Sequence, residues 1–418
     1  MPVASDNAGA GAAWWDDEAG MQRFVADLVA GELAAMRLTG PALPPQPWPA
    51  DMHIGRDLGA DSLELMGLAS ALAEALQMHE SGIEDYLLVR QTLGEWTHIA
   101  KTSLSRFSAR LTFRTSGSTG AAKSCSHALD ALWHEVHEFA PLLRGTRRIF
   151  SAVPAHHIYG FLFTMLLPPA LGLAAAEVID LRAGSPARLA QSLREGDLVI
   201  GHPEFWRAAA RAVPAFPPGV TGVTSTAPCP DDISVALGQA GLASLLQVYG
   251  SSETAGVGWR RRHDQPYQLL SGWQRAGNDG ASLARTGAGD AARVQCQDTL
   301  AWFDERRFLP TGRMDHAVQV GGINVFPARV RRELLLHPDV LDASVRVMRP
   351  GEGNRLKAFV VPRDAGADLA GLHAALSAWA SARLTAPERP RAFSFGAALP
   401  VDGKGKAADW ALPERGTL

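Results

Sequence analysis

A glycine- and hydroxyl-rich loop constrains the fold of this chain more than any other feature of its sequence. The letters TSGSTGAAK occupy residues 115–123 and follow Leu111–Arg114, a segment that predicts a β-strand. Glycines let successive backbone N–H groups turn towards an anion, and hydroxyl groups add further donors. The pattern predicts a phosphate-binding loop; a polar surface turn is the structural alternative. The residues expected to contact phosphate are Thr115, Ser116, Gly117, Ser118, Thr119, Gly120 and Lys123.

This loop differs from the Walker A sequence, GxxxxGK[ST], at one position. Gly117 leads to Ala122-Lys123-Ser124, so alanine stands where the second glycine belongs. A Cβ at that position obstructs the wrapping of the backbone around phosphate. We therefore expect a different ATP-binding loop and keep a P-loop hydrolase as a distant alternative.

Length and periodicity divide the 418 residues into several parts, because a domain usually contains roughly 100–200 residues. Residues 1–20 are rich in Ala and Gly and predict a flexible tail. Helical spacing of apolar residues predicts a helical module over residues 21–105, in which Asp61 is an expected helix N-cap. Alternating strands and helices predict a mostly parallel α/β core over residues 106–313, and residues 314–418 predict a small α+β domain. The chain is thus expected to be a multidomain α/β protein.

Charge and cysteine content exclude several classes of protein. The net charge is −3, from 40 basic and 43 acidic residues, which argues against a nucleic-acid-binding surface. Cys125, Cys229 and Cys296 are widely separated, so neither a disulfide framework nor a zinc knuckle is indicated. A reducing cytoplasm is the expected location.

One apolar stretch, Phe161–Ala176, approaches the length of a membrane span. Pro168, Pro169 and Gly172 interrupt it, so we expect a buried helix that stops at the prolines and then a buried strand. The first 20 residues also lack the basic start and long apolar run of a signal peptide. We therefore expect no membrane association.

Lysine is scarce in this chain, which has 35 Arg but only five Lys. Lysine is a compact point charge, whereas arginine is a planar fork. A lysine within a motif can therefore mark a position that arginine cannot fill. The five are Lys101, Lys123, Lys357, Lys404 and Lys406.

Five segments in order resemble the adenylate-forming enzymes, the superfamily of acyl-CoA synthetases, peptide-synthetase adenylation domains and luciferases. TSGSTGAAK resembles their phosphate loop, and YGSSET at 249–254 resembles their YGxTE segment. Asp298 precedes Arg313 by 15 residues, as the family's ribose-binding Asp precedes its Arg. QVGGINV at 319–325 resembles the stretch after the hinge, and Leu399-Pro400 with Gly405-Lys406 resembles the C-terminal element. The resemblance covers about residues 110–412.

The resemblance implies roles for the nucleotide-binding residues. Glu253 would hold Mg²⁺ on the phosphates of ATP, and Ser252 would contact the α-phosphate. Asp298 would accept hydrogen bonds from the ribose hydroxyls, with Arg313 beside it. Tyr249 would stack against adenine. Read without the resemblance, Glu253 could be a solvated carboxylate and Tyr249 a core aromatic.

The resemblance also implies a mobile C-terminal domain. Lys406 would reach the carboxylate and the α-phosphate, and Asp315 would be the hinge. Gly321 and Gly322 would line a tunnel for a pantetheine arm, or simply form a turn. His157, in the segment PAHHIYG, would be the aromatic gate; a satisfied core histidine is the alternative.

Ring-bearing residues suggest the nature of the acid. His202, Phe205, Trp206 and Thr224–Pro228 are candidate walls of the acyl pocket. Their concentration suggests a flat aromatic acid, such as a hydroxybenzoate, or a short acyl chain.

The N-terminal helices resemble a different family. LGADSL at 58–63 resembles the acyl carrier protein motif, whose Ser accepts phosphopantetheine, and this points to Ser62. A helix capped by Thr92 would be the last of a four-helix carrier. The module could instead be a structural replacement for the large subdomain that usually precedes the phosphate loop.

Together these features predict an acid–thiol ligase that uses ATP and Mg²⁺. It would convert a small carboxylic acid to acyl-AMP and transfer the acyl group to a phosphopantetheine thiol of CoA or of a carrier protein, in cis or in trans. Besides the P-loop hydrolase, a carrier or docking protein with an inactive ligase core stays an alternative.

Overall fold

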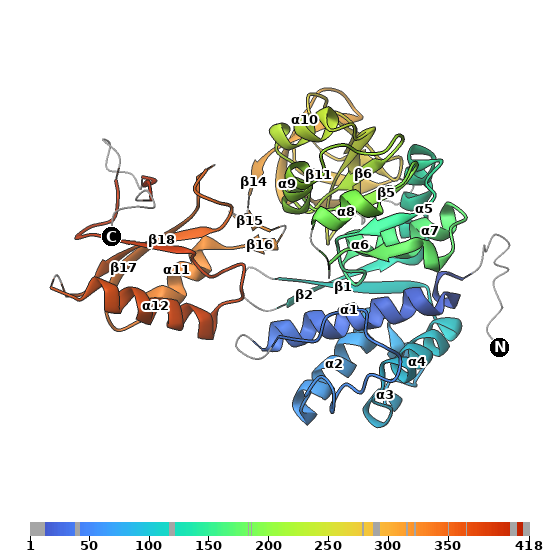
Figure 1. Cartoon of the computed structure of the whole chain (residues 1–418), viewed down its shortest axis with the longest axis horizontal. Helices are drawn as coiled ribbons and strands as arrows, with labels where there is room; N and C mark the ends of the chain where they lie inside the picture. The colour runs from blue at the N-terminus through green and yellow to red at the C-terminus, as the bar shows by residue number, and fades with distance from the viewer. Residues whose placement is uncertain are drawn as a thin grey trace. The chain divides into compact units, whose positions relative to one another are not determined.

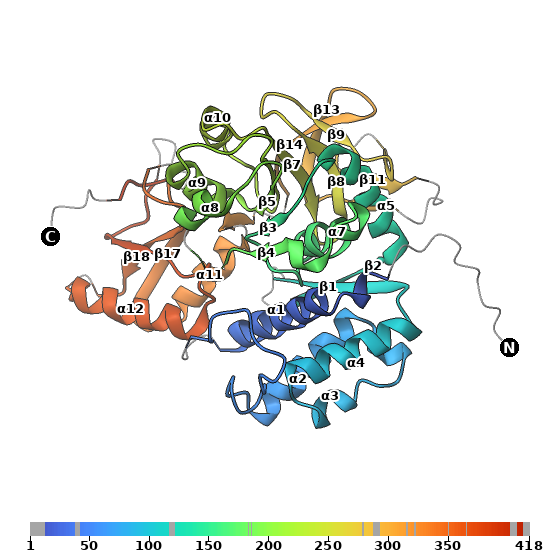
Figure 2. The ribbon, with the colours of Figure 1, turned by 45° about the vertical axis from the view of Figure 1, so that its right-hand side comes forward.

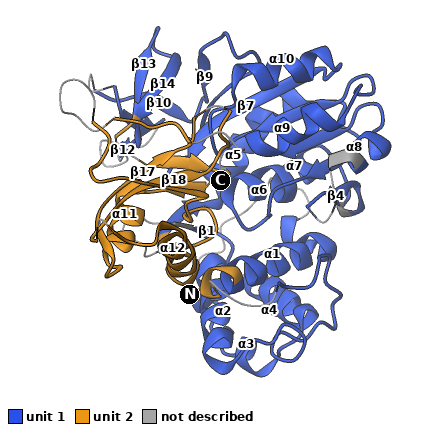
Figure 3. Cartoon of the chain, turned by 60° about the vertical axis from the view of Figure 1, so that its left-hand side comes forward, with its two compact units in different colours: residues 1–33, 42–115, 124–312 blue, residues 34–41, 116–123, 313–418 orange. Residues whose placement is uncertain are grey.

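The computed structural model divides into two compact units (Figure 3). Unit 1 comprises residues 1–33, 42–115 and 124–312, and unit 2 comprises residues 34–41, 116–123 and 313–418. The described residues are 13–37, 42–116, 122–182, 184, 186–277, 280–286, 293–314, 317–321, 323–349, 351–364, 366–401 and 408–412. Within these residues, no helix is long and apolar enough to cross a membrane.

The N-terminal helices of unit 1 begin where local capping chemistry predicts. Asp61 caps the helix α2, Ser62–Ala75, and forms a reciprocal capping box with Glu64. Thr92 forms the same arrangement with Glu95 at the start of α4. Both predicted N-caps are therefore confirmed. The helices of this region are η1 Trp14–Asp16, α1 Glu18–Met36, α2, η2 Met78–Glu80, α3 Tyr86–Val89 and α4 Leu93–Arg106.

Residues 13–20 are packed rather than loose, unlike the tail expected through residue 20. The Trp14 side chain is buried, and its ring lies edge-on to Phe161 with centroids 4.9 Å apart. Helix α1 already begins at Glu18, and Asp17 accepts a hydrogen bond from the Gly20 N–H. The cause is a tertiary contact, which composition does not reveal.

A nine-stranded sheet forms the centre of unit 1, with the order β13-β14-β9-β8-β7-β6-β5-β3-β4. Figure 1 labels β5, β6 and β14 of this sheet. Strands β4, β3, β5, β6 and β7 run parallel, whereas β8 and β9 join antiparallel. The mostly parallel layer expected from sequence is thus confirmed. The strands are β3 Ile149–Ser151, β4 Val178–Asp180, β5 Leu198–Gly201, β6 Thr221–Thr224, β7 Ser244–Ser251, β8 Ala255–Arg260, β9 Tyr267–Leu269, β13 Asp298–Trp302 and β14 Arg307–Arg313.

Both faces of this sheet are buried, because its parallel strands are apolar on both sides. In β5, Leu198 and Ile200 join one hydrophobic core, whereas Val199 joins a second core with Trp206. The helices of unit 1 after β2 are α5 Leu129–Phe139, η3 Ala140–Leu143, α6 Ile158–Phe161, η4 Leu162–Leu166, α7 Leu167–Ala170, η5 Ala175–Glu177, α8 Pro186–Ser192, α9 Pro203–Ala212 and α10 Asp231–Gln239.

The apolar stretch Phe161–Ala176 differs from the prediction. Its helical path continues through the two prolines to Ala170, by way of the π-helical segment η4. Pro168 and Pro169 lie in the first turn of α7, where a missing N–H is tolerated. The following strand, β4, starts only at Val178. The predicted stop at the prolines was therefore wrong.

The N-terminal helices share one continuous core with the large sheet. Phe24, Leu72 and Trp96 belong to the same buried cluster as Ile200 and Val248. The strands β1 Arg110–Ser116 and β2 Ala122–Ala128 pair with each other beside these helices (Figure 2). The Arg114 guanidinium in β1 pairs with Glu32 of α1 and Glu74 of α2.

Between residues 260 and 297, the described residues form short strands and loops. Strands β10 Trp273–Arg275, β11 Ser282–Arg285 and β12 Arg293–Gln295 form an antiparallel three-stranded sheet.

Unit 2 has a core of its own, which includes Val330, Ala358 and Leu376. Strands β17 and β18 pair antiparallel, and β18 pairs parallel with β19. This arrangement agrees with the small C-terminal α+β domain predicted from the sequence. The elements are β15 Val318–Val320, β16 Ile323–Val325, α11 Pro327–Leu335, β17 Val340–Val347, β18 Leu356–Pro362, α12 Leu369–Arg383 and β19 Ala392–Phe395.

Candidate active site

The predicted phosphate loop joins β1 to β2, but most of it lies outside the described residues. Those positions are Gly117, Ser118, Thr119 and Gly120. The backbone of Thr115 and Ser116 ends β1, which confirms the strand expected before the loop. Lys123 is exposed near the start of β2.

The segment 249–254 forms the end of β7 and the turn into β8. Ser251 and Thr254 bind each other across this turn, since the Ser251 N–H donates to Thr254 Oγ1 at 3.0 Å. Gly250 is required here, because a Cβ at this position would lie 2.1 Å from the Ala255 carbonyl oxygen. The backbone of this turn is therefore closely defined by local contacts.

His127 links the strand after the phosphate loop to this turn. Its Nε2 lies 2.7 Å from the Ser252 carbonyl oxygen. Burial is the main cause that lowers the pKa of His127, so the ring is neutral at pH 7 and donates through Nε2–H. Sequence reasoning missed this residue, although its place four residues after Lys123 ties it to the loop.

Two neighbouring residues of the β12–β13 region bind the turn from the other side. The Tyr249 hydroxyl donates to Asp298 Oδ2 at 2.8 Å, and Gln297 Nε2 donates to Glu253 Oε1 at 2.6 Å. The structure thus brings together Tyr249, Glu253 and Asp298, three residues that the sequence singled out. Ser252 lies between them on the same turn.

Two side chains, Glu135 and Arg285, support this turn from behind. The Gly256 N–H donates to Glu135 Oε1 at 2.9 Å, and Arg285 Nη2 donates to the Thr254 carbonyl oxygen at 3.0 Å. Burial raises the pKa of Glu135 to about 8. Glu135 lies on the buried, apolar face of the amphipathic helix α5. A carboxylate at such a position was a signal that sequence reasoning overlooked.

The expected residues of unit 2 are only partly described. Arg313 is the last residue of β14 and is half-buried. Gly321 lies in the turn between β15 and β16 with φ of 61°, a conformation that favours glycine. The expected residues Asp315, Gly322 and Lys406 lie outside the described residues, as does Lys404.

The segment PAHHIYG is fixed by residues from two directions. The Tyr159 hydroxyl is buried and donates to the carbonyl oxygens of Gly201 and Val223, each at 3.0 Å. On the other side, Asp27 of α1 accepts the Ala155 N–H at 2.7 Å. His157 is exposed at the start of α6, and its ring centroid lies 4.1 Å from that of His156.

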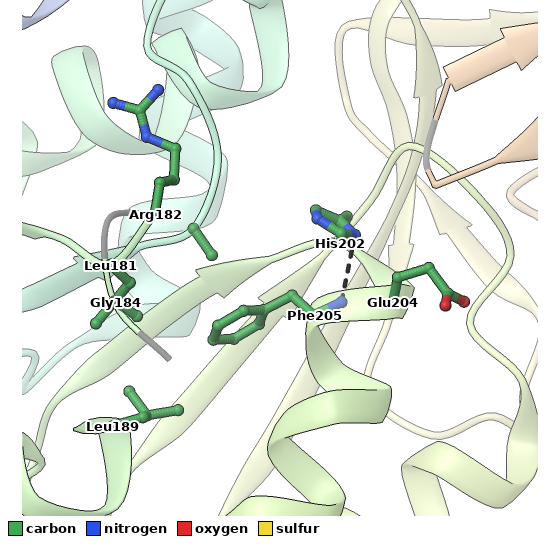
Figure 4. Close-up of a pocket in the computed structure, with 8 residues that line it drawn as sticks. Leu181, Arg182, Gly184, Leu189, His202, Glu204 and Phe205 are labelled. Carbon is green, nitrogen blue, oxygen red and sulfur yellow. Dashed lines mark hydrogen bonds between the residues drawn. The ribbon is translucent and has the colours of Figure 1, made fainter. Parts of the chain in front are cut away.

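A cavity of about 320 Å³ opens at the carboxyl ends of β3, β4 and β5 (Figure 4). This edge of a parallel sheet is where ligands usually bind in α/β proteins. His202 and Phe205, two of the candidate pocket residues, line this cavity, and His202 Nδ1 accepts the Phe205 N–H at 3.3 Å. Leu181, Arg182 and Leu189 also contribute to its wall.

The Arg182 guanidinium in this wall is paired. It donates to Asp27 at 2.6 Å and also contacts Asp180. The cavity therefore offers aromatic and aliphatic surface together with a guanidinium whose charge is balanced.

Two other expected pocket residues behave differently. Trp206 has no exposed surface, and its Nε1 donates to the Val223 carbonyl oxygen at 3.1 Å, so it is a core residue and not a pocket wall. Its place on the inner face of α9, behind β6, accounts for the error. Thr226 has φ of 76°, which is unusual for a β-branched residue. Such strain clusters at functional sites, and nothing in the sequence predicts it.

Ser62 is the exposed first residue of α2, directly after the Asp61 cap. It is thus accessible, but the helix that carries it belongs to the core of unit 1.

Known protein families match segments in both units of this chain. A family model described as "AMP-binding enzyme" matches residues 91–280, and "AMP-binding enzyme C-terminal domain" matches residues 332–406. The 4-coumarate–CoA ligase of Cereibacter sphaeroides is 41% identical and covers 87% of each chain. The 4-coumarate–CoA ligase of Rhodobacter capsulatus is 39% identical over 93% of this chain and 100% of its own length.

Solved structures share the fold at lower identity. An o-succinylbenzoate CoA synthetase from Bacillus subtilis has a TM-score of 0.59 and 17% identity, over 81% of this chain and 80% of its own.

Proposed function

This chain belongs to the AMP-binding enzymes, and from that premise we propose that it joins an aromatic acid of the 4-coumarate type to coenzyme A. That it is an acid–thiol ligase follows from the family and from relatives that match most of its length. The choice of acid rests on one observation, the similarity to 4-coumarate–CoA ligases along nearly the whole chain. The sequence suggested a hydroxybenzoate; a hydroxycinnamate is also flat and aromatic, but longer.

The reaction has two steps. A carboxylate oxygen of the acid attacks the α-phosphorus of ATP, and the bond to pyrophosphate breaks, so acyl-AMP forms. The CoA sulfur then attacks the acyl carbon, the thiol proton is lost, and AMP leaves with the electron pair of the broken C–O bond. Both steps depend mainly on the alignment of the reacting atoms and on the neutralisation of the phosphate charge.

Tyr249 and Glu253 at the turn, together with Asp298 of β13, are proposed to hold the nucleotide. Asp298 takes the ribose hydroxyls, and the Tyr249 hydroxyl at 2.8 Å holds its carboxylate in place. Glu253 would hold Mg²⁺, which would enter with ATP and balance the charge of the phosphates. One protein carboxylate fits Mg²⁺, because this ion usually combines one or two carboxylates with substrate phosphates and water.

Five further positions complete the proposed nucleotide site. Ser252 contacts the α-phosphate, and Thr115 and Ser116 present the strand that leads into the phosphate loop. Lys123 reaches the terminal phosphate. Arg313, in unit 2, accompanies the ribose.

Lys406 is the proposed cation for the first step. A charge about 4 Å from developing negative charge is worth roughly 4 kcal/mol at an effective dielectric near 20. Since about 1.4 kcal/mol corresponds to a factor of ten in rate, its loss should slow adenylation about a thousandfold. For the second step, Asp315 is the proposed hinge, and Gly321 and Gly322 are the proposed lining of the pantetheine path.

The cavity at the carboxyl ends of β3, β4 and β5 is the proposed acid site. Its volume of about 320 Å³ suits a small ligand, and Phe205 supplies an aromatic wall. His157 is proposed as the gate, and it lies within the segment that Asp27 and the Tyr159 hydroxyl hold in place.

CoA is the proposed acceptor, and Ser62 is proposed to carry no pantetheine arm. The relatives are CoA ligases, and α2 shares its core with the large sheet instead of forming a separate carrier.

A panel of acids with ATP, Mg²⁺ and CoA tests the proposal. We expect 4-coumarate to support ATP–pyrophosphate exchange and CoA-thioester formation, with benzoate and short-chain acids at least tenfold less efficient. The same panel with Lys406→Ala should show no exchange in a folded protein. Exchange with short-chain acids alone would overturn the choice of an aromatic acid, and release of ADP instead of AMP would overturn the ligase reaction itself.

A further inference from the structure

Among the lysines that the structure describes, only Lys357 is buried. It lies on β18, the middle strand of the three-stranded sheet of unit 2, and its side chain has no exposed surface. Lysine is almost never fully buried unless its charge is paired. A buried ammonium without partners would cost far more than a typical domain can sustain, so its contacts indicate what it is for.

Three acceptors surround the Lys357 ammonium. Nζ donates to Glu352 Oε2 at 2.8 Å and to the Trp410 carbonyl oxygen at 2.5 Å, and it lies 3.1 Å from Asp409 Oδ1. It also lies 5.1 Å from the centre of the Trp410 ring. Arg349 pairs with Asp409 and balances the second carboxylate. The compact ammonium suits acceptors that converge on one point, whereas the planar fork of arginine does not.

Most of these contacts fix the segment 408–412. The Leu412 N–H donates to Glu352 Oε1 at 3.0 Å, and the Ala408 N–H donates to the Pro400 carbonyl oxygen at 2.9 Å. The Trp410 ring lies edge-on to Phe359 of β18, with centroids 5.6 Å apart. The chain is therefore held to the sheet directly after residues 402–407.

We propose that Lys357 is a positioning residue for adenylation, which anchors Asp409–Trp410 and thereby sets the point from which Lys406 is presented. The inference rests on the function proposed above for Lys406. Lys406 precedes Asp409 by only three residues in the sequence, and a chain of that length spans at most about 11 Å, at about 3.8 Å per residue. Loss of the Lys357 contacts releases residues 408–412 from the sheet of unit 2 and leaves the acid and ATP sites of unit 1 unchanged.

Separate assays of the two half-reactions test this role. In Lys357→Met, which keeps an apolar stem of similar length, we expect ATP–pyrophosphate exchange to fall about 100-fold, the effect of a small misplacement of a reacting group. The KM values for ATP and acid should change less than about threefold, because the loss is in alignment and not in binding. Thioester formation from isolated acyl-AMP and CoA should keep its wild-type rate, since Lys406 acts only in the first step.

Matched variants keep the test decisive. Lys101→Met removes a lysine that pairs with Glu18 in unit 1 and should leave both half-reactions unchanged. If Lys357→Met does not fold, Lys357→Met with Glu352→Gln removes the carboxylate left unpaired and should show the same selective loss.

The outcomes separate this inference from the proposed function. Wild-type exchange in Lys357→Met, or an equal loss in both half-reactions, would overturn the anchoring role while Lys406→Ala still abolishes exchange. If Lys406→Ala itself keeps exchange, the role of Lys406 is wrong, and the inference falls with it.

Discussion

The hydrogen bond between Tyr249 and Asp298 joins residues 49 positions apart and predicts a specific defect. In Tyr249→Phe the carboxylate loses a donor worth about 1 kcal/mol, so the KM for ATP should rise roughly fivefold, while kcat changes little. Steady-state kinetics with varied ATP measures this. Tyr267→Phe is the matched control, because Tyr267 packs in the same aromatic cluster from β9. A tenfold loss in kcat with unchanged KM would contradict the positioning of Asp298 for ribose.

The buried carboxyl of Glu135 predicts how stability depends on pH. Its pKa is raised to about 8 by burial, from an ordinary value near 4.5. The folded protein then binds a proton that the unfolded chain releases, so this group's contribution to stability is complete below about pH 4.5 and is lost as pH rises through about 8.

Glu135→Gln should remove that dependence. Glutamine keeps the shape and an acceptor for the Gly256 N–H without a proton to lose. At pH 9 the variant should be more stable than wild type by a few kcal/mol, since each pKa unit corresponds to about 1.4 kcal/mol. Urea unfolding between pH 5 and pH 9 measures this, with Glu138→Gln on the same helix as the control. Parallel pH profiles for wild type and Glu135→Gln would show that the carboxyl is ionised in the folded state.

Single residues differ in how far the sequence could identify them. Glu253 and Asp298 were predicted as site residues because the segments that contain them resemble motifs of the adenylate-forming enzymes. The side chains of His127 and Glu135 bind backbone groups of a segment distant in sequence. Trp206 of α9 is buried against β6, the strand that follows, and binds its backbone. Such partners depend on the tertiary fold, so no local pattern contains them.

Among the elements, helix ends were the most predictable, because a capping box involves only residues close in sequence. The caps at Asp61 and Thr92 both occur as expected. The π-helical segment Leu162–Leu166 and the helix through two prolines were not predicted, because neighbouring elements stabilise them in a buried site.

Helix α2 allows a direct test of the carrier hypothesis. Its N-terminus is satisfied by Asp61 and Glu64, so Ser62→Ala should change neither the stability nor the CoA ligation rate. Asp61→Ala removes the cap and should lower stability by about 1 kcal/mol. Thermal unfolding and ligation assays measure both variants. Intact-mass analysis after treatment with a phosphopantetheinyl transferase provides the opposite outcome: a pantetheine adduct absent from Ser62→Ala would establish a carrier function.

For the whole molecule, one buried carboxylate shows why the N-terminal helices and the α/β core form a single unit. Asp27 of α1 has only 1% of its surface exposed, yet it binds the Ala155 N–H and the Arg182 guanidinium beside the cavity. Sequence periodicity placed a boundary at 105/106 because the strand pattern begins there. Periodicity reports the type of each element, whereas the packing that joins elements into one core depends on contacts distant in sequence.

Truncated chains should therefore behave unequally. Residues 1–312 contain the whole core of unit 1, so this chain should unfold cooperatively on heating, and it should bind ATP without pyrophosphate exchange. Residues 106–418 lack Phe24, Leu72 and Trp96, which are buried against the sheet. Removal of such side chains exposes a large apolar surface, so this chain should aggregate or lose its near-ultraviolet circular dichroism. Gel filtration and thermal scans of the two chains distinguish the alternatives: a stable, cooperative 106–418 chain would mean that the helical module is a separate domain after all, and the carrier hypothesis would regain its structural basis.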